Sequence, residues 1–108
     1  MNILLVCANG ASTGVLVEKM KTFCKEHEKL RTKEIKIEAT SVDNLRVYFE
    51  SNKVDVVLIG PQIRFKEDEI KNISKPYTEL VQVINTQDYG RMDAVAVMKT
   101  AIKLYRNR

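Results

Sequence analysis

The chain contains few residues of the types that form covalent cross-links or titrate near neutral pH. Its 108 residues include two cysteines, one histidine and no tryptophan. Cys7 is predicted to lie in a loop and Cys24 on the apolar face of a helix, so we expect free thiols in a reducing compartment, not a disulfide. His27 is predicted about four turns into that helix, far from the loop, which favours a structural or solvent-exposed role.

Long apolar runs and a strong excess of one charge are also absent. The apolar run at residues 3–6 is far too short to span a bilayer and has no basic leader, so we expect cytoplasmic residence without direct membrane insertion. The formal net charge is +4, the basic residues are spread along the chain, and aromatic residues make up only 6%. Nucleic-acid binding requires more basic and stacking side chains than this, so it is not expected.

What is present is the composition of an ordinary globular domain. Hydrophobic residues make up 44% of the chain and charged residues 30%, and there are no internal repeats or low-complexity linkers. A chain of this length can bury one core without support from a metal or a disulfide. We therefore expect residues 1–108 to form a single domain.

Four apolar runs alternate with segments of helical periodicity. The run at residues 3–6 is unbroken, and the run at residues 54–59 is interrupted only by Asp55, which is typical of strands buried on both faces of a parallel sheet. Residues 34–40 alternate polar and apolar side chains, which indicates an edge strand, and residues 80–84 form the fourth run. Strands alternating with helices predict an α/β fold with an open parallel sheet.

The predicted helices connect these strands. Apolar residues at helical spacing, including Val15, predict a first helix that begins near Ser12 or Thr13, with either hydroxyl as its cap. A helix from Pro61 is expected to carry Phe65 on its apolar face, and residues 85–90 are expected to form a polar loop. The other two helices are predicted around Leu45 and from about Met92. In such a sheet the loops at the carboxyl ends of the strands converge, so the ligand crevice is expected around Cys7.

A loop of small residues, CANGASTG, follows the first apolar run. Cys7 would lie at the carboxyl end of a strand, facing the amino end of a helix whose free N–H groups and dipole attract negative charge. Gly10 and Gly14 are expected to let the backbone turn its N–H groups toward phosphate oxygens. The same donors would stabilise a thiolate, the nucleophilic form of cysteine. The loop predicts an anion site that needs no metal; the alternative is a buried cysteine in an ordinary strand-to-helix turn.

Three stretches of the chain resemble a known family: CANGASTGVLVEKM, VDVVLIGPQIRF and INTQDYGRMDAVAVMKTAI. They resemble the enzyme IIB component of the lactose, cellobiose and chitobiose branch of the bacterial sugar phosphotransferase system (PTS). The likeness covers nearly the whole chain, and its most specific parts are the CxxGxST pattern at Cys7 and the GPQI turn at residues 60–63. It implies a four-stranded parallel sheet with helices on both faces.

The resemblance also implies an activity and partners. Cys7 would accept a phosphoryl group from a phosphohistidine of the IIA protein and pass it to a sugar, expected to be a β-linked disaccharide such as cellobiose or chitobiose, held by the membrane permease IIC. The protein would be a phosphotransferase without cofactor or metal, associated with the membrane through the permease. The other loop residues would form the phosphate cradle: Ala8, Asn9, Gly10, Ala11, Ser12, Thr13 and Gly14.

Two other functions stay open. The expected architecture is also similar to low-molecular-weight tyrosine phosphatases, which carry a CxxxxxR loop, but the sixth position after Cys7 is Thr13. Lack of the arginine removes transition-state stabilisation of about 3 kcal/mol or more, so phosphocysteine should hydrolyse slowly, as a carrier requires. Asp88 lies where those phosphatases carry an Asp-Pro acid, but without the proline, which favours a turn residue or helix cap. A non-catalytic regulatory domain is the second alternative.

Overall fold

Four parallel strands form the centre of the protein in its computed structural model, which describes residues 1–8 and 11–108. The order across the sheet is β2-β1-β3-β4, and all neighbouring strands run parallel. The predicted four-stranded parallel sheet is confirmed, as is the edge position of the second strand. The strands are β1 (Asn2–Cys7), β2 (Lys36–Ser41), β3 (Val56–Ile59) and β4 (Val81–Val83).

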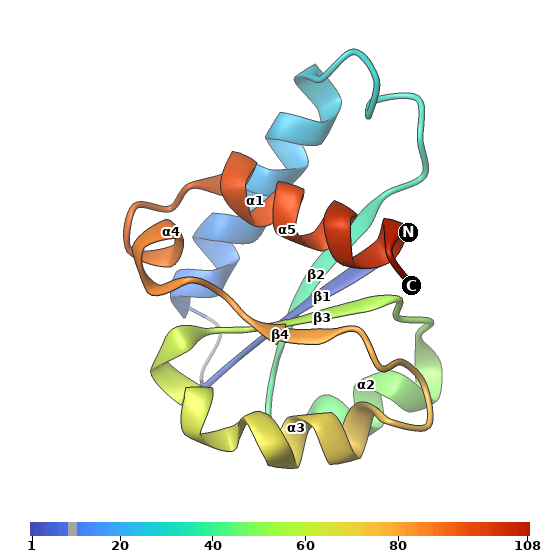
Figure 1. Cartoon of the computed structure of the whole chain (residues 1–108), viewed down its shortest axis with the longest axis vertical. Helices are drawn as coiled ribbons and strands as arrows, with labels where there is room; N and C mark the ends of the chain where they lie inside the picture. Colours follow the sequence, from blue (N-terminus) through green and yellow to red (C-terminus); the bar gives the residue numbers. More distant parts are fainter. Residues whose placement is uncertain (9–10) are drawn as a thin grey trace.

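Helices cover both faces of the sheet (Figure 1). One face carries α1 (Ala11–Glu26), the short α4 (Thr86–Gly90) and α5 (Ala94–Arg106). The other carries α2 (Leu45–Ser51), the 3-10 helix η1 (Pro61–Lys66) and α3 (Glu67–Ser74). Within the described residues, none of these helices has the length and apolar character needed to cross a membrane.

The side chains of β1 divide between two hydrophobic cores, one on each face of the sheet. Ile3 and Leu5 pack with the core under α1 and α5, whereas Leu4 and Val6 pack with the core under α2 and α3. Successive residues of a strand point to opposite faces, so an unbroken apolar run fills both cores. This burial holds the strand that ends in Cys7 rigidly in the centre of the protein.

Two predicted segments differ from the structure between β3 and β4. The helix expected from Pro61 is divided into η1 and α3, with a non-helical residue at Ile63 (φ −118°, ψ 26°). Because a 3-10 turn has about three residues where an α-turn has 3.6, it displaces the following side chains from the α-helical stripe. Phe65 is consequently 76% exposed, whereas Ile63 and Ile70 are buried.

A short helix replaces the polar loop predicted at residues 85–90. The Asn85 side chain caps α4 by accepting hydrogen bonds from the N–H groups of Gln87 and Asp88, at 2.9 and 3.1 Å. Asp88 is therefore a residue of this first turn, and the cap is Asn85. Tyr89 is buried in the core beside α5, with 4% of its surface exposed.

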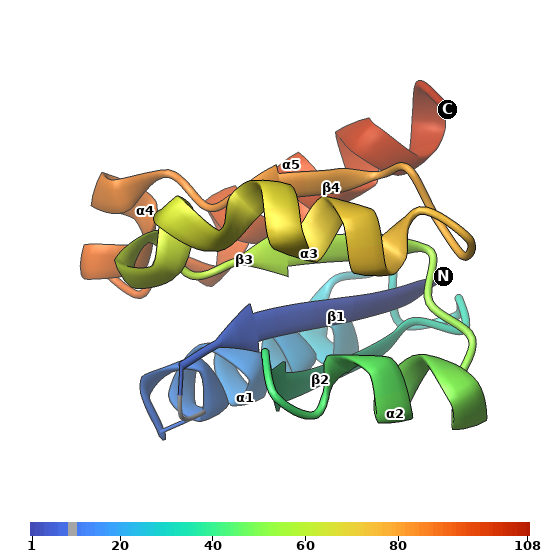
Figure 2. The same cartoon turned by 90° about the horizontal axis from the view of Figure 1, so that it is seen from below.

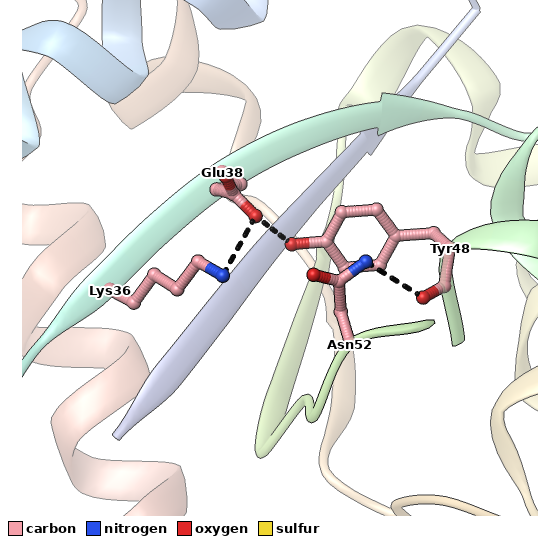
Figure 3. Close-up of polar contacts among 4 residues, drawn as sticks. All are labelled: Lys36, Glu38, Tyr48 and Asn52. Atoms are coloured by element: carbon pink, nitrogen blue, oxygen red, sulfur yellow. Dashed lines mark hydrogen bonds and ion pairs between the residues drawn. The ribbon is translucent and has the colours of Figure 1, made fainter. Parts of the chain in front are cut away.

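A hydrogen bond between Tyr48 and Glu38 ties α2 to the edge strand β2 (Figure 3). The Tyr48 hydroxyl donates to a carboxylate oxygen of Glu38, and Lys36 Nζ lies 3.5 Å from the same oxygen. This hydrogen bond, helped by Lys36, lowers the pKa of Glu38, while burial and the carboxylate raise the pKa of Tyr48. Because β2 reaches Thr40 two residues later, the contact stabilises the edge of the sheet next to Cys7.

We predict that Tyr48→Phe lowers the free energy of unfolding at pH 7 by about 1 kcal/mol, because a hydrogen bond to a charged acceptor is lost. A carboxyl group with a lowered pKa stabilises the fold above its unfolded pKa and loses this effect as pH falls through the folded pKa. The difference between wild type and variant should therefore shrink below about pH 4. Urea unfolding at several pH values measures it.

The matched control is Tyr77→Phe. The Tyr77 ring stacks on Phe49 with centroids 4.5 Å apart, and within residues 1–8 and 11–108 its hydroxyl makes no hydrogen bond. This variant should leave the free energy of unfolding nearly unchanged. Equal losses in the two variants, or a Tyr48→Phe loss that does not vary with pH, would contradict the role given to Glu38.

Candidate functional site

Cys7 is the last residue of β1 and lies at the carboxyl edge of the sheet. It is paired with Ser41 of β2, and the N–H of Val42 donates to its carbonyl at 3.3 Å. Figure 2 shows the starts of α1 and α4 on the side to which the strand arrows point. The structure therefore places Cys7 where the loops after β1, β2, β3 and β4 come together, as the alternating pattern predicted.

Among the residues that the structure describes, the sulfur of Cys7 has two polar neighbours. The hydroxyl of Thr13 donates a hydrogen bond to Cys7 Sγ at 2.8 Å, and Thr13 is fully buried. The carbonyl oxygen of Thr40 lies 3.7 Å from Sγ, where it can accept the thiol proton. Only 7% of Cys7 is exposed. A buried donor aimed at a sulfur stabilises negative charge on that atom, because little water is present to do so instead.

The position of Thr13 corrects the prediction that it caps the first helix. Helix α1 begins at Ala11, so Ser12 and Thr13 are its second and third residues. The Thr13 hydroxyl is directed to the sulfur of Cys7, a long-range use of the side chain. A threonine near a helix start can cap the helix or donate its hydroxyl to a more distant group, so sequence alone could not separate these two roles.

The structure describes only some of the other residues in the loop after β1. Asn9 and Gly10 lie outside the described residues, and of Ala11 and Ser12 only the helical backbone is described. Ala8 is exposed. Gly14 is inside α1, and a Cβ atom built on it would meet no atom within 4 Å. The prediction that Gly14 turns the loop backbone is therefore wrong, since an alanine would fit the same position.

Gly60 brings the GPQI turn close to Cys7. Its N–H donates to the carbonyl of Val6 at 2.8 Å. A Cβ atom at Gly60 would lie 3.3 Å from Gln62 Oε1 and 3.9 Å from Cys7 Cβ. A side chain at Gly60 would therefore crowd the Gln62 side chain and the end of β1. The φ of Gly60, −59°, is ordinary, so the glycine serves close approach and not an unusual backbone conformation.

A small cleft of about 220 Å³ opens between η1 and α4 at the same edge. Gln62 forms part of its wall and contributes an amide group with donor and acceptor atoms. Its lining residues are Pro61, Gln62, Arg64, Thr86, Tyr89 and Gly90.

Cys24 and His27 do not belong to this site. Cys24 is buried under α5, with Sγ 3.9 Å from Met98 Sδ, and burial raises the pKa of its thiol. The predicted core role of Cys24 is confirmed, and both cysteines are free. His27 follows the end of α1, about 24 Å along the helix axis from Ala11, and its ring packs edge-on against Phe23 at 5.3 Å.

Two features next to Cys7 were not assigned by sequence reasoning. The Gln62 amide was contained in a recognised turn, but only the close packing at Gly60 connects it with the cysteine. The Thr40 carbonyl is a backbone group, and its position depends on the pairing of β1 with β2. Because every residue has a carbonyl group, no sequence pattern predicts which one accepts a hydrogen bond from Cys7. The Thr40 carbonyl can be identified only in the folded protein.

Comparison with known proteins identifies the family. The family profile "PTS system, Lactose/Cellobiose specific IIB subunit" matches residues 2–100. The oligo-beta-mannoside-specific EIIB component of Bacillus subtilis is 35% identical over 106 residues, covering 98% of this chain and 97% of the relative. The galactose-specific EIIB component of Lactococcus lactis is 37% identical over 103 residues, covering 94% of each chain.

The fold is also similar to that of a IIB component of known structure. The cellobiose-specific phosphotransferase IIB component of Borrelia burgdorferi superposes with a TM-score of 0.76 at 36% sequence identity. The match covers 99% of this chain and 93% of that protein. On the evidence of its fold, its sequence and the match over residues 2–100, the chain belongs to the lactose/cellobiose-specific IIB subunits of the sugar phosphotransferase system.

Proposed function

We propose that the protein is a phosphocarrier that accepts a phosphoryl group on Cys7 from the phosphohistidine of a IIA protein. It then passes this group to a sugar held by a IIC permease, at the inner face of the membrane. The observation that carries the proposal is the buried Thr13 hydroxyl, which donates to Cys7 Sγ at the carboxyl edge of the sheet. Membership of the IIB family supports the phosphotransferase activity in sugar uptake.

The chemistry requires two in-line displacements at phosphorus. In the first, the Cys7 sulfur attacks, the S–P bond forms and the N–P bond to the histidine breaks, and the freed histidine can take the thiol proton. In the second, the sugar hydroxyl attacks, the O–P bond forms, the S–P bond breaks, and the hydroxyl proton is transferred to the leaving sulfur, which restores the Cys7 thiol. Positioning and electrostatic stabilisation supply most of the catalysis in such transfers, and we propose no step for a metal or cofactor.

Thr13 and the start of α1 have separate tasks in this scheme. Thr13 stabilises the negative charge that develops on the sulfur as the thiol proton leaves and as the phosphoryl group departs. The free N–H groups at the start of α1, together with the backbone of residues 8–14, would bind the phosphoryl oxygens.

The loop contains the groups of a carrier and lacks one that a phosphatase uses. No arginine occurs in residues 7–14, so the transferring group has no bidentate guanidinium contact there. Water attack on the S–P bond should accordingly be slow, which preserves the phosphoryl group for the sugar. We propose a β-linked disaccharide such as cellobiose or chitobiose as the final acceptor; relatives of similar identity are named for oligo-beta-mannoside and for galactose.

The decisive experiment is intact-protein mass spectrometry after incubation with phosphorylated IIA, together with an aryl-phosphate turnover assay. We expect wild type to gain the mass of one phosphoryl group and to keep it for minutes, with negligible aryl-phosphate turnover. Cys7→Ser should gain no mass, whereas Cys24→Ser should behave as wild type. Sustained turnover that depends on Cys7 would instead indicate a phosphatase, and absence of both signals would indicate a regulatory domain.

Thr13 provides a second test. Thr13→Val removes the hydroxyl but keeps the shape of a buried side chain, so we expect the rate of phosphoryl acceptance to fall by roughly tenfold to a hundredfold. Thr13→Ser keeps the donor and should retain most of the rate. Quench-flow measurement of phosphoprotein formation gives both rates, with thermal unfolding as a check on the fold. Equal rates for the two variants would show that the hydrogen bond to Cys7 has no part in the transfer.

A further inference from the structure

A second concave surface lies at the opposite end of the protein from Cys7. It is formed by the second half of α1, the turn at residues 27–35 and the start of β2, and we call it the α1–β2 cleft. Its volume is about 330 Å³, which lies within the range of small-molecule sites, about 300–1,000 Å³. In Figure 1 the end of α1 and the turn that follows it project away from the rest of the molecule.

Most of the charged side chains that line this cleft are basic. Its charged lining consists of five cationic side chains and one carboxylate, a net charge of four. The formal net charge of the whole chain is also +4, so all the residues outside the lining are balanced in charge. The cationic residues are Lys21, Lys25, Arg31, Lys33 and Lys36, and the carboxylate is Glu38.

Little inside the protein neutralises these cations. Lys36 lies 3.5 Å from Glu38, whose carboxylate also accepts the hydrogen bond from Tyr48. Lys21 approaches Glu18 only at 4.0 Å. Within the part of the chain that the structure describes, the other three cationic side chains, Lys25, Arg31 and Lys33, form no ion pair, and all three are exposed. Their mutual repulsion would be relieved by an anion bound between them.

The floor of the cleft is apolar. Cys24 and Ile37 are buried there, and Leu30 and Ile35 are partly buried against the core. An apolar floor with a charged rim is typical of sites that bind an organic body together with its anionic groups. Lysine ammonium groups and an arginine guanidinium are the side chains that recognise phosphate.

This cleft is separate from the site at Cys7. Lys36 is paired with Asn2 at the start of β1, whereas Cys7 is paired with Ser41 at its end. Five residue steps along a strand separate the two ends by about 17 Å. A phosphoryl group on Cys7 therefore cannot also contact the α1–β2 cleft.

We propose that the α1–β2 cleft is a second anion site, which binds a small soluble compound carrying two or more phosphate groups. Five cations match a multiply charged ligand better than a single carboxylate, and a cleft of about 330 Å³ has the size of a small-molecule site. The ligand would bind at the far end of α1, the helix whose first turn carries Thr13.

Titration of the full ¹⁵N-labelled chain with inorganic tripolyphosphate tests the proposal at about 0.15 M salt, where long-range attraction is screened. We expect saturable amide shifts within residues 21–38. The triple variant Lys25→Gln/Arg31→Gln/Lys33→Gln should bind at least about tenfold more weakly, because three charge contacts are lost. The control Lys53→Gln/Lys75→Gln/Lys99→Gln loses the same charge from exposed positions outside the cleft and should keep the affinity within about twofold.

Several results would overturn the proposal. Shifts confined to residues 8–14 would place the anion at the Cys7 loop alone. Equal weakening in the two triple variants, or shifts that do not saturate, would indicate general charge attraction. Cosedimentation with phosphatidylglycerol vesicles, without binding of tripolyphosphate, would mean that the basic surface contacts a membrane and not a soluble ligand.

Discussion

The hydrogen bond from Thr13 to the sulfur of Cys7 joins the end of β1 to the first turn of α1, and the rest of the site depends on this junction. The strand is fixed because its side chains fill cores on both faces of the sheet. The neighbouring edge strand is fixed through Glu38 and Tyr48, which keeps the Thr40 carbonyl next to the sulfur. The proposed nucleophile is thus held in one position and needs no rearrangement before it reacts.

The sequence predicted the sheet well because buried parallel strands need nearly continuous apolar runs, and these are plain at residues 3–6 and 56–59. It could not predict the kink at Ile63, since one non-helical residue leaves the apolar spacing almost intact while it exposes Phe65. Helix α4 has five residues, too few to show periodicity. The position of Cys7 followed from the pattern of strands, whereas the phosphate-binding role of residues 8–14 stays a prediction.

The distribution of charged residues also could not be predicted from the sequence. Along the sequence the basic residues are spread, and the net charge of +4 suggests no particular partner. Folding brings Lys21 and Lys25 of α1 next to Arg31 and Lys36, so one cleft contains the whole excess. One helix thereby connects two positions suited to anions: its amino end faces Cys7, and its carboxyl half lines the α1–β2 cleft.

The central claim is that the phosphoryl group is bound to the sulfur of Cys7. Phosphorus NMR of the protein after phosphorylation by IIA tests this most directly, because S–P and N–P bonds give resonances in different chemical-shift ranges. The account predicts a single S–P resonance, unchanged in His27→Gln. An N–P resonance that disappears in His27→Gln would contradict it, since the phosphoryl group would then be on the only histidine of the chain.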